Sequence, residues 1–199
     1  MVIIDYNDEW PVNFRKIKEE FEKHLTSYVT IEHIGSTAIK GMCAKPIIDV
    51  MMIARDDINF AQIKGELERK FGYFHVGDWG ITGREVFKRK NSFRKESLRE
   101  QELLKNNFYS HNGEIKSETL DTISHNLYVC KTGAEEIRKY RLFRDYLNKN
   151  HEEMLRYHRL KQEIIGTYGN NDYELYCKIK EENYSHFFND IINKAGALT

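Results

Sequence analysis

A nearly continuous apolar run at residues 46–54 constrains the fold of this chain more than any other segment. A short run of this kind is typical of a central strand covered on both faces, and it predicts a mixed α/β (α+β) fold. Asp49 is the one acid inside it. Because an acid is costly to bury unless it is paired or used, Asp49 is a candidate site residue. The structural alternative is a carboxylate paired with Lys45, Arg84 or backbone amides.

The periodicity of the flanking segments predicts the other elements of this half. Asp8, Glu9 and Pro11 are typical of a helix start, and Asp57 and Gly72 are expected at the two ends of a second helix. The expected order is a helix to about residue 24, a strand over 28–34, a small-residue turn over 35–38, the apolar strand, the second helix, and strands over 73–76, 84–90 and 122–130. The polar stretch 91–121 is a long connection, either mobile or functional.

From Thr132 onward the pattern is helical. Thr132 and Glu135 match a capping box, residues 148–150 are expected to divide a long helical pattern, and Asp172 is expected to begin a last helix that runs to about residue 193. We therefore expect an α/β core over residues 1–131 and a helical region over residues 132–199 that packs on it. The two parts can also be counted as one domain.

Composition narrows the function classes. The chain has 31 Lys and Arg against 31 Asp and Glu, so its net charge gives no argument for nucleic acid. A basic run between residues 88 and 105 is interleaved with acids, which favours a solvated segment over a nucleic-acid interface. No apolar run approaches the roughly 18 residues of a membrane span, and the first residues lack the basic region of a signal peptide. The 3 separated cysteines indicate reduced thiols, so we expect a cytoplasmic protein with no membrane partner.

Residues 31–52 place an anion-binding turn ahead of the buried acid. A Gly-Ser turn that opens a helix offers N–H groups and a hydroxyl to a phosphate, and an acid on the next strand can hold Mg²⁺ against it. Gly35, Ser36 and Asp49 fit this layout, which is typical of nucleotidyltransferases. Met51 stands where that layout has a second acid, and two-metal phosphoryl transfer needs several carboxylates. The structural alternative for Gly35, Ser36 and Thr37 is a tight turn that requires small residues.

The segment EHIGSTAIKG followed by AKPIIDV resembles the defining segment of the GrpB-like family, a bacterial branch of the nucleotidyltransferase fold. The resemblance covers nearly the whole chain and is weak only over about 91–121. It implies a nucleotidyltransferase-like mixed β-sheet core with flanking helices and a C-terminal helical region. Its other motifs are YNDEWP (6–11), GREVF (83–87), SHNLYV (124–129), LFRDYLNKNHEEMLRYHRLK (142–161) and YCKIK (176–180).

By position, the resemblance implies anion binding by Gly35 and Ser36, with Asp49 as the strand acid and Lys45 as the loop lysine. The family's histidine strand reads His-His-Leu-His, and only His125 matches it here, because Asn126 and Tyr128 replace the other two. His125 is a candidate metal ligand beside Asp49, or else a hydrogen-bonded core histidine.

Further side chains complete the candidate site. His33 is a candidate acid–base or phosphate-binding group, with a structural role as the alternative. Lys45 and Arg84 could neutralise a triphosphate, although Lys45 could instead pair with Asp49 and Arg84 could be solvated. Lys161 and Lys180 could close over a ligand from the helical half. Arg144 and Asp145 are expected to be structural.

These residues predict a protein that binds a nucleotide or another phosphate-bearing small molecule. If it is active, it would transfer a nucleotidyl group from a nucleoside triphosphate to a small-molecule acceptor, with a single Mg²⁺ held by Asp49 and His125. The alternative is a catalytically silent nucleotide-binding regulatory module. It is motivated by Met51 and by the loss of two of the three histidines that the resemblance implies for the strand of His125. A metal-dependent hydrolase or a toxin–antitoxin partner is a third option.

Overall fold

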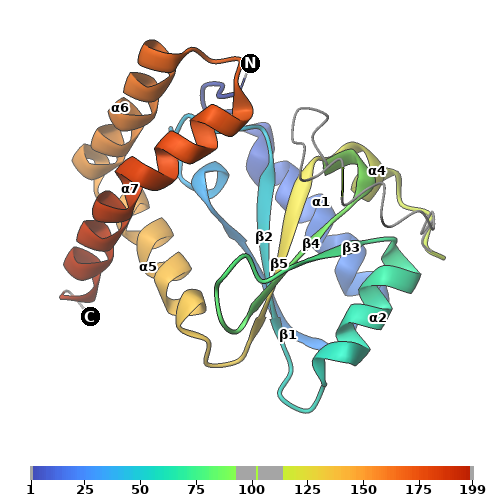
Figure 1. The fold of residues 1–199 in the computed structure, drawn as a ribbon. Coiled ribbons are helices and arrows are strands. Elements are labelled where there is room, and N and C mark those ends of the chain that lie inside the picture. The colour runs from blue at the N-terminus through green and yellow to red at the C-terminus, as the bar shows by residue number, and fades with distance from the viewer. Residues whose placement is uncertain (1, 93–101, 103–113, 198–199) are drawn as a thin grey trace.

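A mixed five-stranded sheet forms the centre of the computed structural model, which describes residues 2–92, 102 and 114–197 (Figure 1). The strand order is β1-β2-β5-β4-β3. β2 and β5 are parallel, and the other neighbouring pairs are antiparallel. The strands are β1 (Tyr28–Ile34), β2 (Ile48–Ala54), β3 (Phe74–Gly77), β4 (Arg84–Lys88) and β5 (His125–Lys131).

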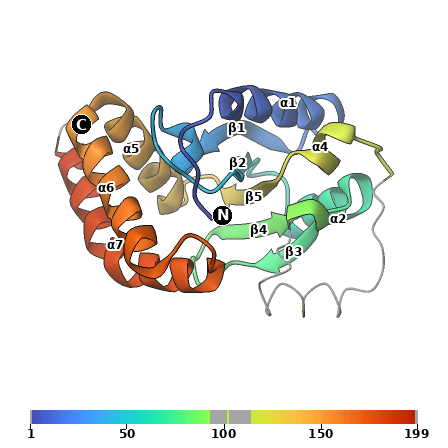
Figure 2. The ribbon, with the colours of Figure 1, turned by 90° about the horizontal axis from the view of Figure 1, so that it is seen from above.

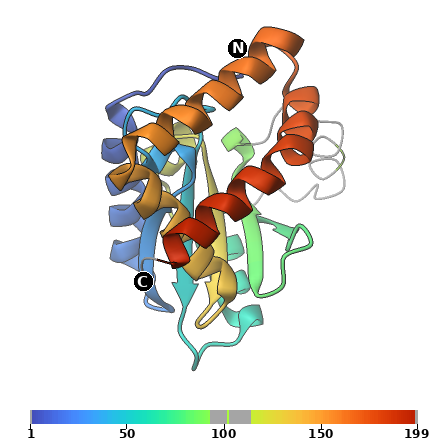
Figure 3. The same ribbon diagram turned by 90° about the vertical axis from the view of Figure 1, so that its left-hand side faces the viewer.

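Helices cover both faces of this sheet (Figure 2). One face carries α1 (Glu9–His24), α2 (Phe60–Phe71) and α4 (Glu118–Thr122). The other carries α5 (Glu135–Lys149), which is followed by α6 (His151–Tyr168) and α7 (Tyr173–Gly196). Viewed from that side, α6 and α7 cross in front of the strands (Figure 3). The predicted mixed α/β fold is confirmed.

Both faces of β2 are buried, which explains why every residue of the strand except Asp49 is apolar. Val50 and Met52 belong to the core cluster that includes α1 and α2. Met51 and Ile53 point the other way and pack with Ile137 of α5. Since neighbouring residues of a strand face opposite sides of the sheet, Asp49 lies on the α5 side with Met51.

A further core cluster joins the N-terminal residues and the segment after β1 to the C-terminal helices. It contains Val2, Ile3, Ile39, Met42 and Cys43 together with apolar side chains of α5, α6 and α7. Asn170 ties the N-terminus to this cluster, because its side chain accepts from the backbone N–H groups of Val2 and Ile3 and donates to the carbonyl of Ile3. Within the described part of the chain, no helix is long and apolar enough to cross a membrane.

Local hydrogen bonds determine which residues cap the helices, and one of these caps differs from the prediction made from the sequence. Asn59, not Asp57, caps α2, since its Oδ1 accepts from Gln62 N at 2.9 Å. Asp57 pairs with the preceding Arg55 instead. Gly72 ends α2 in the left-handed conformation as predicted, and Asp172 caps α7 by accepting from Leu175 N.

The boundaries around β5 also differ from the prediction. Residues 118–122 form the short helix α4, so β5 begins at His125 rather than at residue 122. Thr132 does not open a capping box, because its hydroxyl donates to the carbonyl of Ala54 and α5 begins at Glu135. Most of the polar stretch 91–121 and of the basic run lies outside the described residues. Lys88 and Arg89, expected in a solvated run, are buried.

Candidate functional site

A cavity of about 970 Å³ opens between the α5-side face of the sheet and the helices α6 and α7. This volume is typical of sites for small molecules. Ser36 and Thr37 line it beside Asp49, and helices α6 and α7 contribute Lys161 and Lys180. The remaining polar and aromatic lining comes from Lys45, Asp78, Trp79, Lys88, Asn126, Tyr128, Glu174, Tyr176, Lys178 and Glu181.

Gly35 brings the turn against the buried acid. The last residue of β1, Ile34, is paired with Asp49 across the sheet. Gly35 follows with φ of 71° and ψ of −171°, a backbone region that essentially only glycine adopts. A Cβ atom at Gly35 would lie 3.0 Å from the Cβ of Asp49, closer than side chains normally approach. Glycine is therefore required at position 35 by the close contact with Asp49.

The predicted small-residue turn over residues 35–38 is present. Ser36–Ala38 forms a single 3-10 turn, η1, rather than the start of an α-helix. The backbone N–H groups of Ala38 and Ile39 are bonded to the carbonyls of Gly35 and Ser36. A helix dipole therefore contributes little at this turn, and any attraction for an anion must come mainly from side chains.

Asp49 is held by two side chains of β5. Its Oδ1 accepts a hydrogen bond from Asn126 Nδ2 at 2.9 Å and another from the Tyr128 hydroxyl at 3.2 Å. These two residues stand where the resemblance led us to expect histidines. Both stand on the same face as Asp49, since Asp49 pairs with Asn126 in the parallel ladder. They were not among the site residues predicted from the sequence, although the register of β2 and β5 places them beside the acid.

Lys161 joins helix α6 to the turn. Its ammonium group donates to Ser36 Oγ at 2.7 Å and to the carbonyl of Cys43 at 2.8 Å, and it lies 4.3 Å from the centre of the Tyr157 ring. The residue is 2% exposed. Burial, and after it the positive charge of Lys180, hold the pKa of Lys161 well below its ordinary value.

Other charged groups surround this lysine. The cavity is lined by five lysines and four acids, so cations are in slight excess. The Nζ atom of Lys45 lies 3.7 Å from the Sγ atom of Cys177. The Nζ atom of Lys180 lies 5.9 Å from the centre of the Tyr184 ring. The structure therefore brings together the predicted residues Ser36, Thr37, Lys45, Asp49, Lys161 and Lys180, with Gly35 packed beneath them.

His125 does not join this group, which corrects the expectation of an Asp49–His125 metal pair. It pairs with Ile48 and so faces the α1 side of the sheet. Its Nδ1 donates to the carbonyl of Ile123 at 2.7 Å, and its Nε2 accepts from the hydroxyl of Tyr73. Burial lowers the pKa of His125 to about 4. One step along a strand reverses the face, so a residue next to Asn126 cannot reach Asp49.

His33 and Arg84 do not line the cavity; they contact Thr37 and Tyr128, two residues that do. His33 stacks on Phe14 of α1 with ring centres 4.9 Å apart, and its Nε2 bonds the hydroxyl of Thr37 at 2.9 Å. Burial lowers the pKa of His33 to about 4. Arg84 is buried, not solvated as the alternative expected. Its guanidinium lies 5.2 Å from the centre of the Tyr128 ring and bonds the hydroxyl of Tyr140.

The position of the second acid is apolar. Met51 is fully buried in a cluster with Ile34, Ile53, Cys130 and Ile137. Across the described ranges, no group of three or more His, Cys, Asp or Glu side chains is arranged to hold a metal ion. Asp49 therefore has no second carboxylate on its strand with which to bind two ions.

A single Mg²⁺ is compatible with the oxygens present. Asn126 Oδ1 is buried and has no hydrogen-bond partner among the described residues. Its side chain contacts Asp49. One carboxylate and one amide oxygen would leave most positions of an octahedral ion for water and phosphate oxygens, which is common for Mg²⁺.

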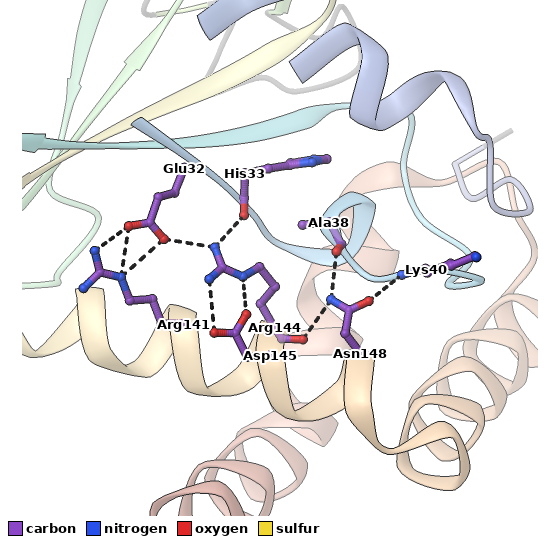
Figure 4. Close-up of polar contacts among 8 residues, drawn as sticks. All are labelled: Glu32, His33, Ala38, Lys40, Arg141, Arg144, Asp145 and Asn148. Atoms are coloured by element: carbon purple, nitrogen blue, oxygen red, sulfur yellow. Dashed lines mark hydrogen bonds and ion pairs between the residues drawn. The ribbon is translucent and has the colours of Figure 1, made fainter. Parts of the chain in front are cut away.

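Helix α5 anchors the turn and the end of β1 (Figure 4). Arg144 crosses to the sheet, as expected for a structural residue, and its Nη1 donates to Glu32 Oε2 at 3.0 Å and to the carbonyl of His33 at 3.1 Å. Asn148 donates to the carbonyl of Ala38 at 3.0 Å. The backbone that carries Gly35 and Ser36 is thus fixed on both sides.

Comparison with known proteins gives a consistent result. Residues 1–194 match the sequence model of a family described as "GrpB protein". The Glutamate-rich protein GrpB of Alkalihalophilus pseudofirmus is 27% identical over 195 residues, which are 98% of this chain and 95% of that protein. The UPF0157 protein YqkA of Bacillus subtilis is 26% identical over 98% of this chain and 50% of its own length.

The fold is shared with a solved structure. The crystal structure of the conserved protein GrpB from Enterococcus faecalis matches with a TM-score of 0.69. The match covers 98% of this chain and 96% of that one, at 22% sequence identity. At this identity the likeness concerns the fold alone.

Proposed function

The chain belongs to the GrpB family, as its motifs indicated, and from this premise we propose that its cavity binds the phosphate groups of a nucleotide or a similar phosphate-bearing small molecule. The phosphates would lie against Ser36, Lys45, Lys161 and Lys180. Asp49 would stand beside them. His125 has no part in this proposal, and His33 and Arg84 act only by supporting Thr37 and Tyr128.

One observation carries the proposal: Lys161 has a buried side-chain amine whose hydrogen bonds go to neutral oxygens. Its partners are the Ser36 hydroxyl and the Cys43 carbonyl, and its Nζ faces the Tyr157 ring. Burying an ammonium without a bonded carboxylate is costly. A cavity that keeps such a group next to Lys180 favours an anionic ligand, which would supply the missing negative charge.

Nucleotidyl transfer is the reaction that this arrangement supports best. An acceptor hydroxyl would attack the α-phosphorus of a nucleoside triphosphate, Asp49 would take the hydroxyl proton, and pyrophosphate would leave. The lysines would offset the charge on the phosphates. A Mg²⁺ ion bound to the triphosphate would add charge neutralisation and would take Asp49 and Asn126 as its protein ligands.

A catalytically silent binding module is the second candidate, and Met51 favours it. Because this residue is packed in the apolar cluster under α5, the protein offers one strand acid where two-metal enzymes use several. In that case the cavity would bind nucleotide as a signal, and closure of α6 and α7 over it would be the response.

Calorimetric titration tests the binding. Wild type should bind ATP or CTP with and without Mg²⁺, Lys161→Met should weaken binding by about tenfold or more because a charged hydrogen-bond donor is lost, and the exposed control Lys16→Met should bind like wild type. Absence of heat with every nucleoside triphosphate and with tripolyphosphate would refute the proposal.

Turnover separates the two candidates. Nucleoside triphosphates labelled at the α-phosphate are incubated with pools of hydroxyl and amine acceptors and with wild type or Asp49→Asn. Labelled product that depends on Asp49 establishes transfer. Binding with no product in any pool, with or without Mg²⁺, favours the silent module.

A further inference from the structure

Trp79 occupies an unusual place in the connection between β3 and β4. Its φ is 52°, and it is the one residue other than glycine with positive φ in the described part of the chain. This conformation is unfavourable for a bulky side chain. Trp79 also remains 39% exposed and lines the cavity. A strained, exposed aromatic residue at a cavity wall indicates a functional role rather than a packing role.

The loop geometry holds the indole in position. Gly77 and Gly80, on either side, have φ values of 89° and 74°. Asp78 Oδ1 accepts from the backbone N–H of Gly80 at 2.8 Å, which closes the turn around Trp79. The tryptophan is therefore presented by a tight, glycine-flanked loop.

The contacts of the ring leave part of it open toward the cavity. The ammonium of Lys88 lies 5.5 Å from the ring centre. Tyr128 meets the ring edge-on, with centres 6.4 Å apart and planes at 80°. The hydroxyl of the same tyrosine bonds Asp49. Tyr128 thus connects Trp79 with Asp49, because it contacts both side chains.

We propose that Trp79 is the stacking platform for the base of a nucleotide whose phosphates lie against Lys161 and Ser36. This inference rests on the proposed function and narrows its ligand class to molecules with a planar heteroaromatic ring, in place of sugar phosphates or inorganic polyphosphate. Aromatic side chains bind bases of any sequence through their π faces. The cavity of about 970 Å³ is large enough for base, sugar and phosphates together.

The experiment compares two ligands on matched variants. ATP and tripolyphosphate are titrated into wild type, Trp79→Leu and Trp79→Phe. We expect ATP to bind wild type more tightly than tripolyphosphate, Trp79→Leu to lose about tenfold or more in ATP affinity, Trp79→Phe to keep most of it, and tripolyphosphate to bind all three proteins equally.

Tryptophan fluorescence gives an independent readout. Trp10 and Trp79 are the two tryptophans of the chain, and Trp10, in α1, is buried at 3% exposure. ATP should quench the fluorescence of a Trp10→Phe variant and leave that of Trp79→Phe nearly unchanged, while ribose 5-phosphate should quench neither.

Each outcome bears on the inference. Equal binding of ATP and tripolyphosphate to wild type and to Trp79→Leu overturns it and leaves the phosphate proposal intact. A parallel loss of both ligands in Trp79→Leu indicates a structural role for the residue and also overturns it. If neither ligand binds wild type, the proposed function and this inference fail together.

Discussion

Gly35 lies so close to Asp49 that a Cβ atom on the glycine would stand 3.0 Å from the Cβ of the aspartate and would overlap its Oδ2. The two residues are neighbours because Ile34 pairs with Asp49 across β1 and β2. The Gly-Ser turn and the strand acid are therefore packed together so closely that a side chain at position 35 would have to displace Asp49.

Replacement of Gly35 by alanine should destabilise the protein by about 3 kcal/mol or more. One part is the strain of a φ of 71° in a region that non-glycine residues avoid, and the other is the clash with Asp49. Urea unfolding followed by circular dichroism measures the loss. In the Gly35→Ala/Asp49→Ala double variant, part of the loss should be recovered, because Oδ2 and Cγ are gone.

The matched control is Gly133→Ala. Gly133 also has positive φ, 77°, but no atom lies within 4 Å of its Cβ position. Its replacement should cost about 1 kcal/mol. Equal losses at the two glycines, or additive losses in the double variant, would show that the contact between Gly35 and Asp49 contributes nothing.

Asp49 was predictable from the sequence, whereas its partners were not. An acid inside an apolar strand stands out on physical grounds alone. Asn126 and Tyr128, which bond it, are 77 and 79 residues away. Their proximity depends on the parallel register of β2 and β5, which sequence spacing does not specify. The same register places His125 on the opposite face, so a motif match at one residue led to a wrong metal ligand.

Element ends were less predictable than the elements themselves. The strand pattern over 28–34 and the apolar run were recovered because their periodicity spans several residues. A helix cap depends on a single hydrogen bond instead. Asn59 caps α2 because the carboxylate of Asp57 is paired with Arg55. Thr132 does not cap α5 because its hydroxyl donates to the carbonyl of Ala54. Tertiary contacts of this kind override local signals.

The buried amine of Lys161 should make stability rise with pH. Its pKa in the folded state is lowered by burial, so between that value and its ordinary pKa of about 10.4 the unfolded chain binds more protons than the folded one. The free energy of unfolding should therefore increase as pH rises through this window, by up to about 1.4 kcal/mol per pH unit.

Comparison with Lys161→Met isolates this contribution. The variant keeps a long apolar side chain and lacks the titrating amine. The free energy of unfolding of wild type minus that of the variant should therefore rise from pH 7 toward pH 9.5. The measurement is chemical unfolding at several pH values. A difference that stays constant across this range would mean that Lys161 is not affected by burial as described.

Arg144 should contribute more to stability than its neighbour Arg141, although both bond Glu32. The side chain of Arg144 is 20% exposed and also donates to the carbonyl of His33, whereas that of Arg141 is 43% exposed. Arg144→Met should cost about 1–3 kcal/mol, and Arg141→Met at most about 1 kcal/mol. Thermal and urea unfolding of the two variants decide the order, and a larger loss for Arg141→Met would contradict it.

Acid should destabilise the protein through His125. Its pKa is about 4 in the folded state because it is buried, against about 6.5 in an unfolded chain. The unfolded chain therefore takes up a proton first as pH falls. The stabilising contribution is complete above about pH 6.5 and is lost as pH decreases toward 4, which amounts to about 2 kcal/mol by pH 5.

The double variant Tyr73→Phe/His125→Leu removes this dependence without leaving the Tyr73 hydroxyl unpaired. Between pH 7.5 and 5 it should lose about 2 kcal/mol less than wild type in free energy of unfolding, measured by urea titration. His151→Gln, which removes an exposed imidazole, should follow wild type. His33 also has a pKa of about 4, so some acid sensitivity must persist in the double variant. An unchanged acid dependence would show that His125 does not titrate as a buried neutral imidazole.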